Sequence, residues 1–208
     1  PVTQVVYSQG LVLGTKPTMP VNDLPALVAA AKKAPNSISY AHTGVGTPPF
    51  VAAELFRRAA GVEFVAVPYK GTSNVLTDVI SGQADMTFSG IPSTLEFVRT
   101  GKVKAFGTTG AKRATVLPDI PTFQELGYGD MDIRGYYGLW VPVGTPQDRV
   151  DALYKATTRA LQDSDIRKIF AEGALDIIAS TPKEFADFIA ADLGRQKQNV
   201  KTLGLQAQ

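Results

Sequence analysis

The sequence predicts an α/β protein with a parallel, doubly wound sheet. Between residues 37 and 88, three short apolar runs alternate with two helical segments, and each connection is short. A strand–loop–helix order with short connections is typical of parallel α/β units. Both loops that lead into these helices contain glycine beside threonine or serine, which are turn-forming residues.

The elements of this first part follow from periodicity and from cap residues. A helix is expected from residue 24, because apolar residues recur at helical spacing after a cap at Asn22 or Asp23. Strands are predicted at residues 37–41, 63–67 and 84–88. The helices between them are predicted at residues 48–59, ending at Gly61, and at residues 74–80, ending at Ser81-Gly82.

The second part of the chain has a different pattern. A capping box, Thr122 to Glu125, predicts a short helix, and residues 133–143 read as a long aromatic strand. Further helices are expected after Thr145-Pro146 and at residues 164–172, with a short strand at 174–179. A second capping box, Thr181 to Glu184, predicts the closing helix, with Phe185, Phe188, Ile189, Leu193 and Val200 facing inward.

Composition narrows the classes of function. A chain of 208 residues can bury a core as one large or two small domains. Its net charge is only +2 with scattered lysines and arginines, which argues against a nucleic-acid surface. No apolar run approaches the roughly 18 residues of a membrane span. The absence of cysteine excludes disulfides, and the start at Pro1, without initiator methionine or signal peptide, suggests a processed or trimmed product.

The first loop, TGVGTPPF at residues 43–50, is suited to an anion. Ligands of parallel α/β sheets bind beyond the carboxyl ends of the strands, where helix N-termini offer unpaired N–H groups. Gly44 and Gly46 let the backbone approach a ligand, Thr43 and Thr47 supply hydroxyls, and Pro48 suits the first helical position. An ordinary strand-to-helix turn explains the same residues without a ligand.

The remaining candidates lie in the second loop and at strand ends. The second loop repeats the pattern of the first, and His42 and Ser89 stand near the ends of predicted strands; the candidates here are Tyr69, Lys70, Gly71, Thr72, Ser73, His42 and Ser89. Nucleotide-binding fingerprints fail, because Pro49 replaces the third glycine and Lys70 precedes Gly71. With one histidine and no cysteine, neither a catalytic motif nor a zinc cluster is present, so no cofactor or metal is expected.

The ordered motifs resemble a known family. Ser39-Tyr40-Ala41 with Gly44 to Thr47, Val67 to Gly71, Gly82 to Met86, Leu117 to Thr122 and Tyr137 to Pro146 occur in the order seen in periplasmic solute receptors of tripartite tricarboxylate transporters, often called Bug-type receptors. The likeness spans nearly all of the 208 residues. Two departures border the expected pocket. The family usually has histidine where this chain has Phe50, and a small polar residue where it has His42.

The resemblance implies a type II periplasmic-binding-protein fold with two doubly wound lobes that close on a small carboxylate. Residues 7–128 would form lobe two, and residues 1–6 with 129–208 part of lobe one, whose first half is absent. Loops 43–48 and 69–73 would hold one ligand carboxylate. The chain alone is then expected to bind weakly and to self-associate, because a share of the carboxylate contacts and of the apolar cover is missing.

Two functions stay open at this point. The first is a non-enzymatic periplasmic receptor, not embedded in the membrane, that delivers a carboxylate to a membrane permease or to a sensor protein. The second is a small-molecule enzyme of the α/β class that uses the same anion-binding loops.

Overall fold

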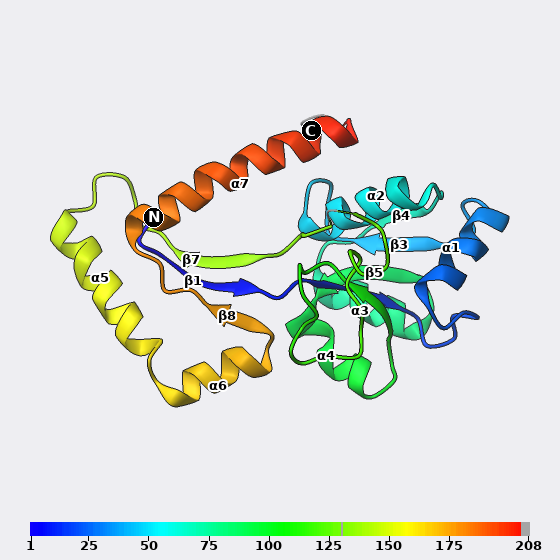
Figure 1. Ribbon diagram of the computed structural model, residues 1–208, viewed down its shortest axis with the longest axis horizontal. Coiled ribbons are helices and arrows are strands. Elements are labelled where there is room, and N and C mark those ends of the chain that lie inside the picture. The colour runs from blue at the N-terminus through cyan, green and yellow to red at the C-terminus, as the bar shows by residue number, and fades with distance from the viewer. Residues whose placement is uncertain (130, 205–208) are drawn as a thin grey trace. The chain divides into compact units, whose positions relative to one another are not determined.

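The computed structural model describes residues 1–129 and 131–204 (Figure 1). Within them the chain forms two compact units. Unit 1 consists of Pro1–Ser8 and Gly135–Gln208, and unit 2 consists of Gln9–Arg134.

Unit 2 is built on a five-stranded sheet in the order β4-β3-β5-β2-β6. Its strands are β2 (Leu11–Thr15), β3 (Ser39–His42), β4 (Val65–Pro68), β5 (Met86–Gly90) and β6 (Lys104–Thr108). β3 pairs in parallel with β4 and β5, as predicted. β2, which was not predicted from the sequence, runs antiparallel to both β5 and β6. The strand run at residues 11–15 lies far in sequence from its partners, and local patterns do not reveal such pairing.

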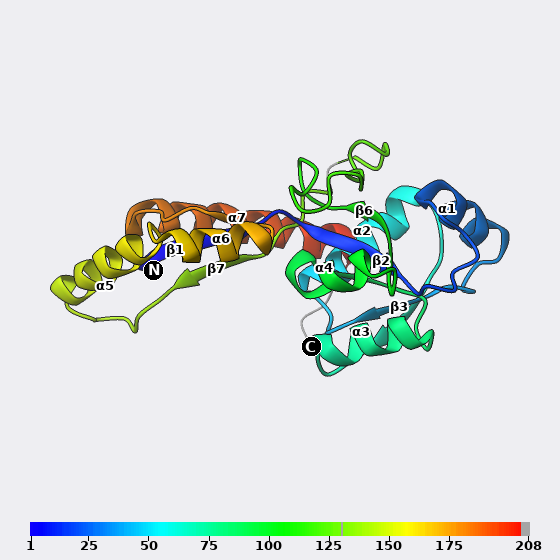
Figure 2. The same cartoon turned by 90° about the horizontal axis from the view of Figure 1, so that it is seen from below.

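Helices cover both faces of this sheet (Figures 1 and 2). They are α1 (Leu24–Lys33), α2 (Pro48–Ala60), α3 (Thr72–Ser81) and α4 (Ile91–Arg99). On one face, Val75 and Val79 of α3 pack against Ala41. On the other face, Phe56 of α2 packs edge-to-face against Phe88 and Phe123. The predicted cap residues are confirmed. Asp23 caps the start of α1, and α2 and α3 end at Gly61 and Gly82, which have left-handed backbone conformations.

The first capping box forms without a helix. Thr122 N–H donates to Glu125 Oε2 at 2.7 Å, and Glu125 N–H donates to Thr122 Oγ1 at 3.1 Å. Residues 123–127 nevertheless form turns rather than the predicted helix. The box is followed by Leu126, Gly127, Tyr128 and Gly129. The two glycines leave too few helix-forming residues for a helix to propagate.

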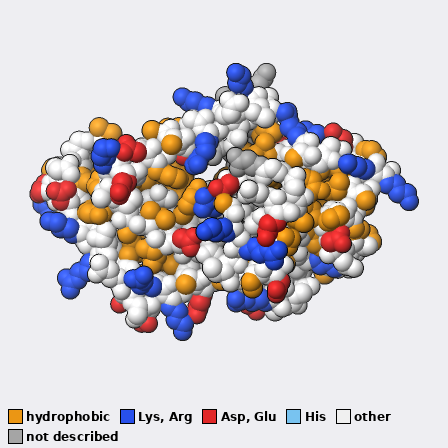
Figure 3. Space-filling model, in the orientation of Figure 1, with side chains coloured by type: hydrophobic (Ala, Val, Ile, Leu, Met, Phe, Trp, Pro, Cys, Tyr) orange, Lys and Arg blue, Asp and Glu red, His pale blue; other side chains and the backbone are white. Residues whose placement is uncertain are grey.

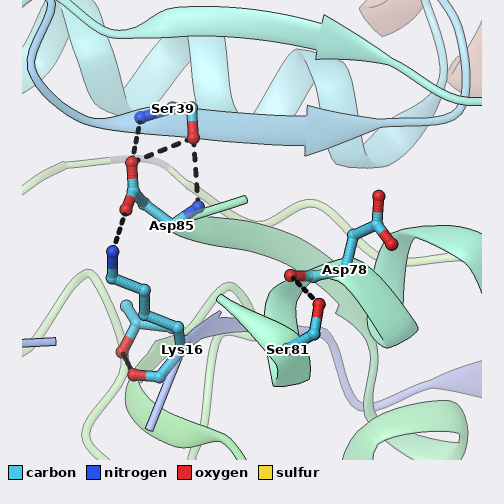
Figure 4. Close-up of polar contacts among 6 residues, drawn as sticks. Lys16, Ser39, Asp78, Ser81 and Asp85 are labelled. Atoms are coloured by element: carbon cyan, nitrogen blue, oxygen red, sulfur yellow. Dashed lines mark hydrogen bonds and ion pairs between the residues drawn. The ribbon is translucent and has the colours of Figure 1, made fainter. Parts of the chain in front are cut away.

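A cluster of polar contacts ties together strands of unit 2 (Figure 4). Lys16 Nζ lies 2.6 Å from Asp85 Oδ1, and Asp85 Oδ2 accepts hydrogen bonds from the N–H and Oγ of Ser39 at 2.8 and 2.9 Å. These residues stand after β2, before β5 and at the start of β3. Partial burial by itself would raise the pKa of Asp85, but the Lys16 ammonium and the Ser39 hydrogen bonds outweigh it and lower that pKa.

Unit 1 contains a three-stranded antiparallel sheet in the order β7-β1-β8. Its elements are β1 (Thr3–Ser8), β7 (Tyr136–Leu139), α5 (Gln147–Ala160), α6 (Ser164–Glu172), β8 (Leu175–Ile177) and α7 (Pro182–Leu203). The strand predicted at residues 133–143 is much shorter, because only Tyr136–Leu139 pair with β1, from Tyr7 back to Thr3. The second capping box does open α7, as predicted.

The core of unit 1 is aromatic and incompletely covered. Phe185 and Phe188 of α7 contact Tyr136, with ring centroids 6.1 and 4.8 Å away. Leu193 and Val200, predicted to face inward, are 55% and 42% exposed. Hydrophobic side chains therefore remain at the surface of this unit (Figure 3). Capping and helix formation follow from local sequence, whereas which apolar side chains become buried depends on the elements that pack against them.

Candidate functional site

The predicted site residues gather at one edge of the sheet in unit 2. Because β4, β3 and β5 are parallel neighbours, their carboxyl ends meet at this edge. His42 and Ser89 lie at or near the ends of β3 and β5, and each strand leads through a short connection into α2, α3 or α4. The first loop contributes Thr43, Gly44, Gly46, Thr47 and Pro48, and the second contributes Tyr69, Lys70, Gly71, Thr72 and Ser73.

The first loop is held by hydrogen bonds of its own. Gly44 N–H donates to His42 Nδ1 at 3.1 Å, and Thr47 Oγ1 donates to the Gly44 carbonyl at 2.7 Å. Gly44 and Gly46 have φ angles of 133° and 81°, a region that favours glycine. The Thr47 hydroxyl was expected to donate to a ligand, but it donates to the Gly44 carbonyl within the loop. Thr47 also forms no side-chain cap to α2.

The start of α2 offers few donors. Pro48 and Pro49 are its first two residues, and proline has no N–H. Val51 N–H already donates to the Thr47 carbonyl. The N–H of Phe50 has no hydrogen-bond partner in the described part of the chain. Within this first turn, it is therefore the donor that remains for a ligand. This consequence of the double proline was not predicted from the sequence.

The start of α3 offers more donors. Its cap residue, Gly71, makes no side-chain bond, and Val75 N–H is the first to donate within the helix, to the Gly71 carbonyl. Among the described residues, the N–H groups of Thr72, Ser73 and Asn74 have no hydrogen-bond partner. Three unpaired donors at a positive helix end form a suitable cradle for an anion.

Ser89 is a buried hydroxyl at the same edge. It is 2% exposed, and its Oγ has no hydrogen-bond partner within residues 1–129 and 131–204. Thr87, two residues earlier on β5, pairs with Ala41, which packs against α3. Because side chains alternate along a strand, Ser89 lies on the same face as Thr87, toward α3. A buried polar atom without a partner is costly, so Ser89 is a strong candidate for a ligand or water contact.

The charged groups nearest to this edge are largely committed. Tyr69 Oη donates to Asp78 Oδ2 at 2.8 Å, and this bond raises the pKa of Tyr69. Glu54 of α2 accepts from Tyr40 Oη at 2.8 Å and pairs with Arg57. Lys70 is exposed and forms no ion pair in the part of the chain that the structure describes. Neutral donors therefore outnumber free charges here.

The described residues contain no group of three or more metal-ligating side chains placed to hold an ion, and none of their helices is both long and apolar enough to cross a membrane. A groove of about 340 Å³ does lie between α3 and α4. Its lining includes Thr72 and Ser73 from the predicted site, with Ser93 of α4, which the sequence analysis did not identify, and apolar Leu76, Ile80 and Phe97.

A comparison with known proteins places this geometry in a family. The model of the tripartite tricarboxylate transporter family receptor matches residues 1–205. Protein BugT of Bordetella pertussis is 30% identical over 195 residues, which cover 93% of this chain and 60% of the relative. The chain spans between 55% and 60% of the length of the first three curated relatives that it matches.

Solved structures agree on the fold. The periplasmic binding protein BugD superposes with a TM-score of 0.94 at 27% identity, over 100% of this chain and 70% of BugD. A protein of R. palustris solved with adipate gives 0.92 at 25% identity, over 98% of this chain and 68% of that one. MatC of Rhodopseudomonas palustris, with bound malate, gives 0.81 at 27% identity, over 98% and 67%. The prediction of a periplasmic-binding-protein fold is confirmed.

Proposed function

The chain belongs to the tripartite tricarboxylate transporter receptor family, and from this premise we propose that it binds a small carboxylate at the carboxyl edge of the sheet in unit 2. Two observations carry the proposal: the unpaired N–H groups of Thr72, Ser73 and Asn74, and the Ser89 hydroxyl, which has no partner among the described residues and lies at the same sheet edge. Backbone donors at a helix start recognise a carboxylate without a fixed cation.

The wider role follows the same premise. The receptor would work in the periplasm and pass its ligand to the membrane permease of the transporter, or report it to a sensor protein. Residues 7–128 would form the lobe that supplies the loops described above, and residues 1–6 with 129–208 part of the other lobe. Adipate and malate, which relatives bind, are the first ligands to test.

A single substitution can remove one donor and leave α3 intact. Thr72 is the first residue of α3, where proline is favoured, and Gly71 before it has the extended conformation that proline requires, with φ −171° and ψ 156°. Thr72→Pro therefore deletes one N–H group with little cost to the helix. Thr72→Val deletes only the hydroxyl.

The chain offers a matched control. Ser164 is the first residue of α6 in unit 1, and the capping carboxylate of Asp163 accepts from Asp165 and Ile166 rather than from Ser164. Ser164→Pro thus makes the same change away from the proposed site. Binding is measured by amide shifts in NMR titrations with adipate and malate, which detect millimolar affinities.

We expect saturable shifts at Thr72, Ser73 and Asn74, with the acid recovered unchanged. A hydrogen bond to a charged group contributes about 1.5–3 kcal/mol, so Thr72→Pro should weaken binding by about 10-fold to 150-fold. Ser164→Pro should bind like the parent chain. Equal affinity of the two proline variants would remove the start of α3 from the site. The absence of saturable shifts with every acid, including other di- and tricarboxylates, would contradict the proposed function.

A further inference from the structure

His42 is the single histidine of the sequence, and its hydrogen bond indicates which ring nitrogen carries the proton. It ends β3 and is only 4% exposed. Because Gly44 N–H donates to Nδ1 at 3.1 Å, Nδ1 must carry a lone pair, and the proton of the neutral ring resides on Nε2.

This contact is one of three hydrogen bonds that orient Gly44 in the first loop. The N–H of Gly44 is held by His42, and its carbonyl accepts from Thr47 Oγ1 at 2.7 Å and from Thr47 N–H at 3.4 Å. The Gly44 φ angle of 133° lies in a region that side chains rarely adopt. Both peptide groups that flank this unusual conformation are thus oriented by hydrogen bonds. Val45 and Gly46, which follow, have N–H groups without partners among the described residues.

The surroundings of the ring favour the neutral form. The ring packs against Tyr40 of β3 and Phe50 of α2, with centroids 5.6 and 5.0 Å away. Burial lowers the pKa of His42. Glu54 of α2 acts on the ring in the opposite direction, but its charge is already paired with Arg57.

Two further titratable groups belong to the elements packed around His42. The phenol of Tyr40 donates to Glu54, and that of Tyr69, which follows β4, donates to Asp78. The backbone N–H of Tyr69 also donates to the His42 carbonyl at 2.8 Å, which fixes the end of β3 beside the second loop.

We infer that His42 is a positioning residue: its neutral imidazole holds the TGVGT loop, and a proton on Nδ1 releases it. Protonation turns Nδ1 from an acceptor into a donor, so that two N–H groups face each other and the bond to Gly44 is lost. The loop then leaves the conformation that presents the N–H groups of Val45 and Gly46. Carboxylate binding at this edge, which rests on the proposed function, would weaken as the pH falls through the pKa of His42.

The state of the ring can be read directly, because one histidine gives one set of imidazole signals. In ¹⁵N-labelled chain at pH 7.5 we expect the Nε2-protonated tautomer, and a titration midpoint below the ordinary 6.5. The amide signals of Gly44 and Val45 should move with the same midpoint. The inference would be overturned if the neutral ring were protonated on Nδ1, or if the Gly44 amide signal did not move as His42 titrates.

Two variants separate positioning from simple packing. His42→Asn keeps an acceptor that does not titrate, whereas His42→Phe keeps an aromatic ring without an acceptor. At pH 7.5 the Gly44 amide should exchange with solvent about threefold to tenfold faster in His42→Phe than in the parent chain, as for the loss of one neutral hydrogen bond. In His42→Asn it should stay protected from pH 7.5 to 5. Equal exchange in His42→Phe and the parent would contradict the role.

Adipate titrations at pH 7.5 and 5 test the consequence for binding. Adipate takes up protons itself between these pH values, so the two proteins are compared with each other. We expect affinity to fall about tenfold more in the parent chain than in His42→Asn. The same fall in both proteins would show that another group causes it, which contradicts the inference. If adipate binds to neither protein, the proposed function fails for this acid, while the imidazole and Gly44 signals still decide the role of His42.

Discussion

Replacing Asp85 by asparagine tests the polar cluster that joins the strands of unit 2 (Figure 4). The carboxylate lies 2.6 Å from Lys16 Nζ and accepts two hydrogen bonds from Ser39. Asparagine keeps one oxygen that can accept from Ser39 N–H, but it leaves the Lys16 ammonium unpaired. Breaking a fully buried pair costs about 3–5 kcal/mol. Because the two side chains are 23% and 20% exposed, we expect a smaller loss, about 2 kcal/mol.

Unfolding in urea is monitored by far-UV circular dichroism, and the fluorescence of Trp140 separately monitors the unfolding of unit 1. Lys16→Met and the double variant complete a thermodynamic cycle, in which we expect a coupling of about 1–2 kcal/mol. Asp119→Asn, an exposed carboxylate of the same unit, is the control and should change stability by less than about 0.5 kcal/mol. An Asp85→Asn variant as stable as Asp119→Asn, or strictly additive effects in the cycle, would refute the reasoning.

The same cluster predicts a dependence of stability on pH. The folded pKa of Asp85 lies below its ordinary value of 3.8. A carboxyl with a lowered folded pKa contributes stability that is fully present above its unfolded pKa and is lost as the pH falls through its folded pKa. The stability gap between the parent chain and Asp85→Asn should therefore be constant near neutral pH and narrow progressively below about pH 4.

Four further substitutions test the loops of unit 2 and the core of unit 1. Gly46→Ala should lower the free energy of urea unfolding by about 1–2 kcal/mol, because φ is 81° although no atom lies within 4 Å of the new Cβ. Gly71 has equal space but an extended φ, so Gly71→Ala should lower it by under about 1 kcal/mol. Equal losses in the two variants would argue against backbone strain at Gly46. In Gly138→Ala the new Cβ would clash with Phe185 Cζ, which should cost about 1–3 kcal/mol in the Trp140 fluorescence transition of unit 1. An unchanged transition would contradict this packing. Lys70→Met should weaken adipate binding no more than about tenfold, and a loss of several orders of magnitude would show direct pairing of Lys70 with the ligand.

Local signals in the sequence were sufficient for most helices of unit 2 and for the sheet edge at which the two loops lie. Asp23, Gly61 and Gly82 act within one helical turn of the ends they define, so their effect is readable without knowledge of the fold. The strand-to-helix order also predicted that both loops reach the same sheet edge, because parallel neighbouring strands leave no other arrangement. Whether those loops hold a carboxylate stays a prediction.

The tertiary structure decided what depends on partners distant in sequence. β2 enters the sheet antiparallel between β5 and β6, and the box at Thr122 forms around a turn because its neighbours do not continue a helix. Ser89 was a candidate because it stands near a strand end, but only its surroundings show that its hydroxyl is buried and has no partner among the described residues. The bond from Gly44 to His42 likewise requires a particular loop conformation. Periodicity and caps are determined by a few adjacent residues, whereas strand pairing, burial and hydrogen-bond satisfaction depend on which distant groups fill the space around them.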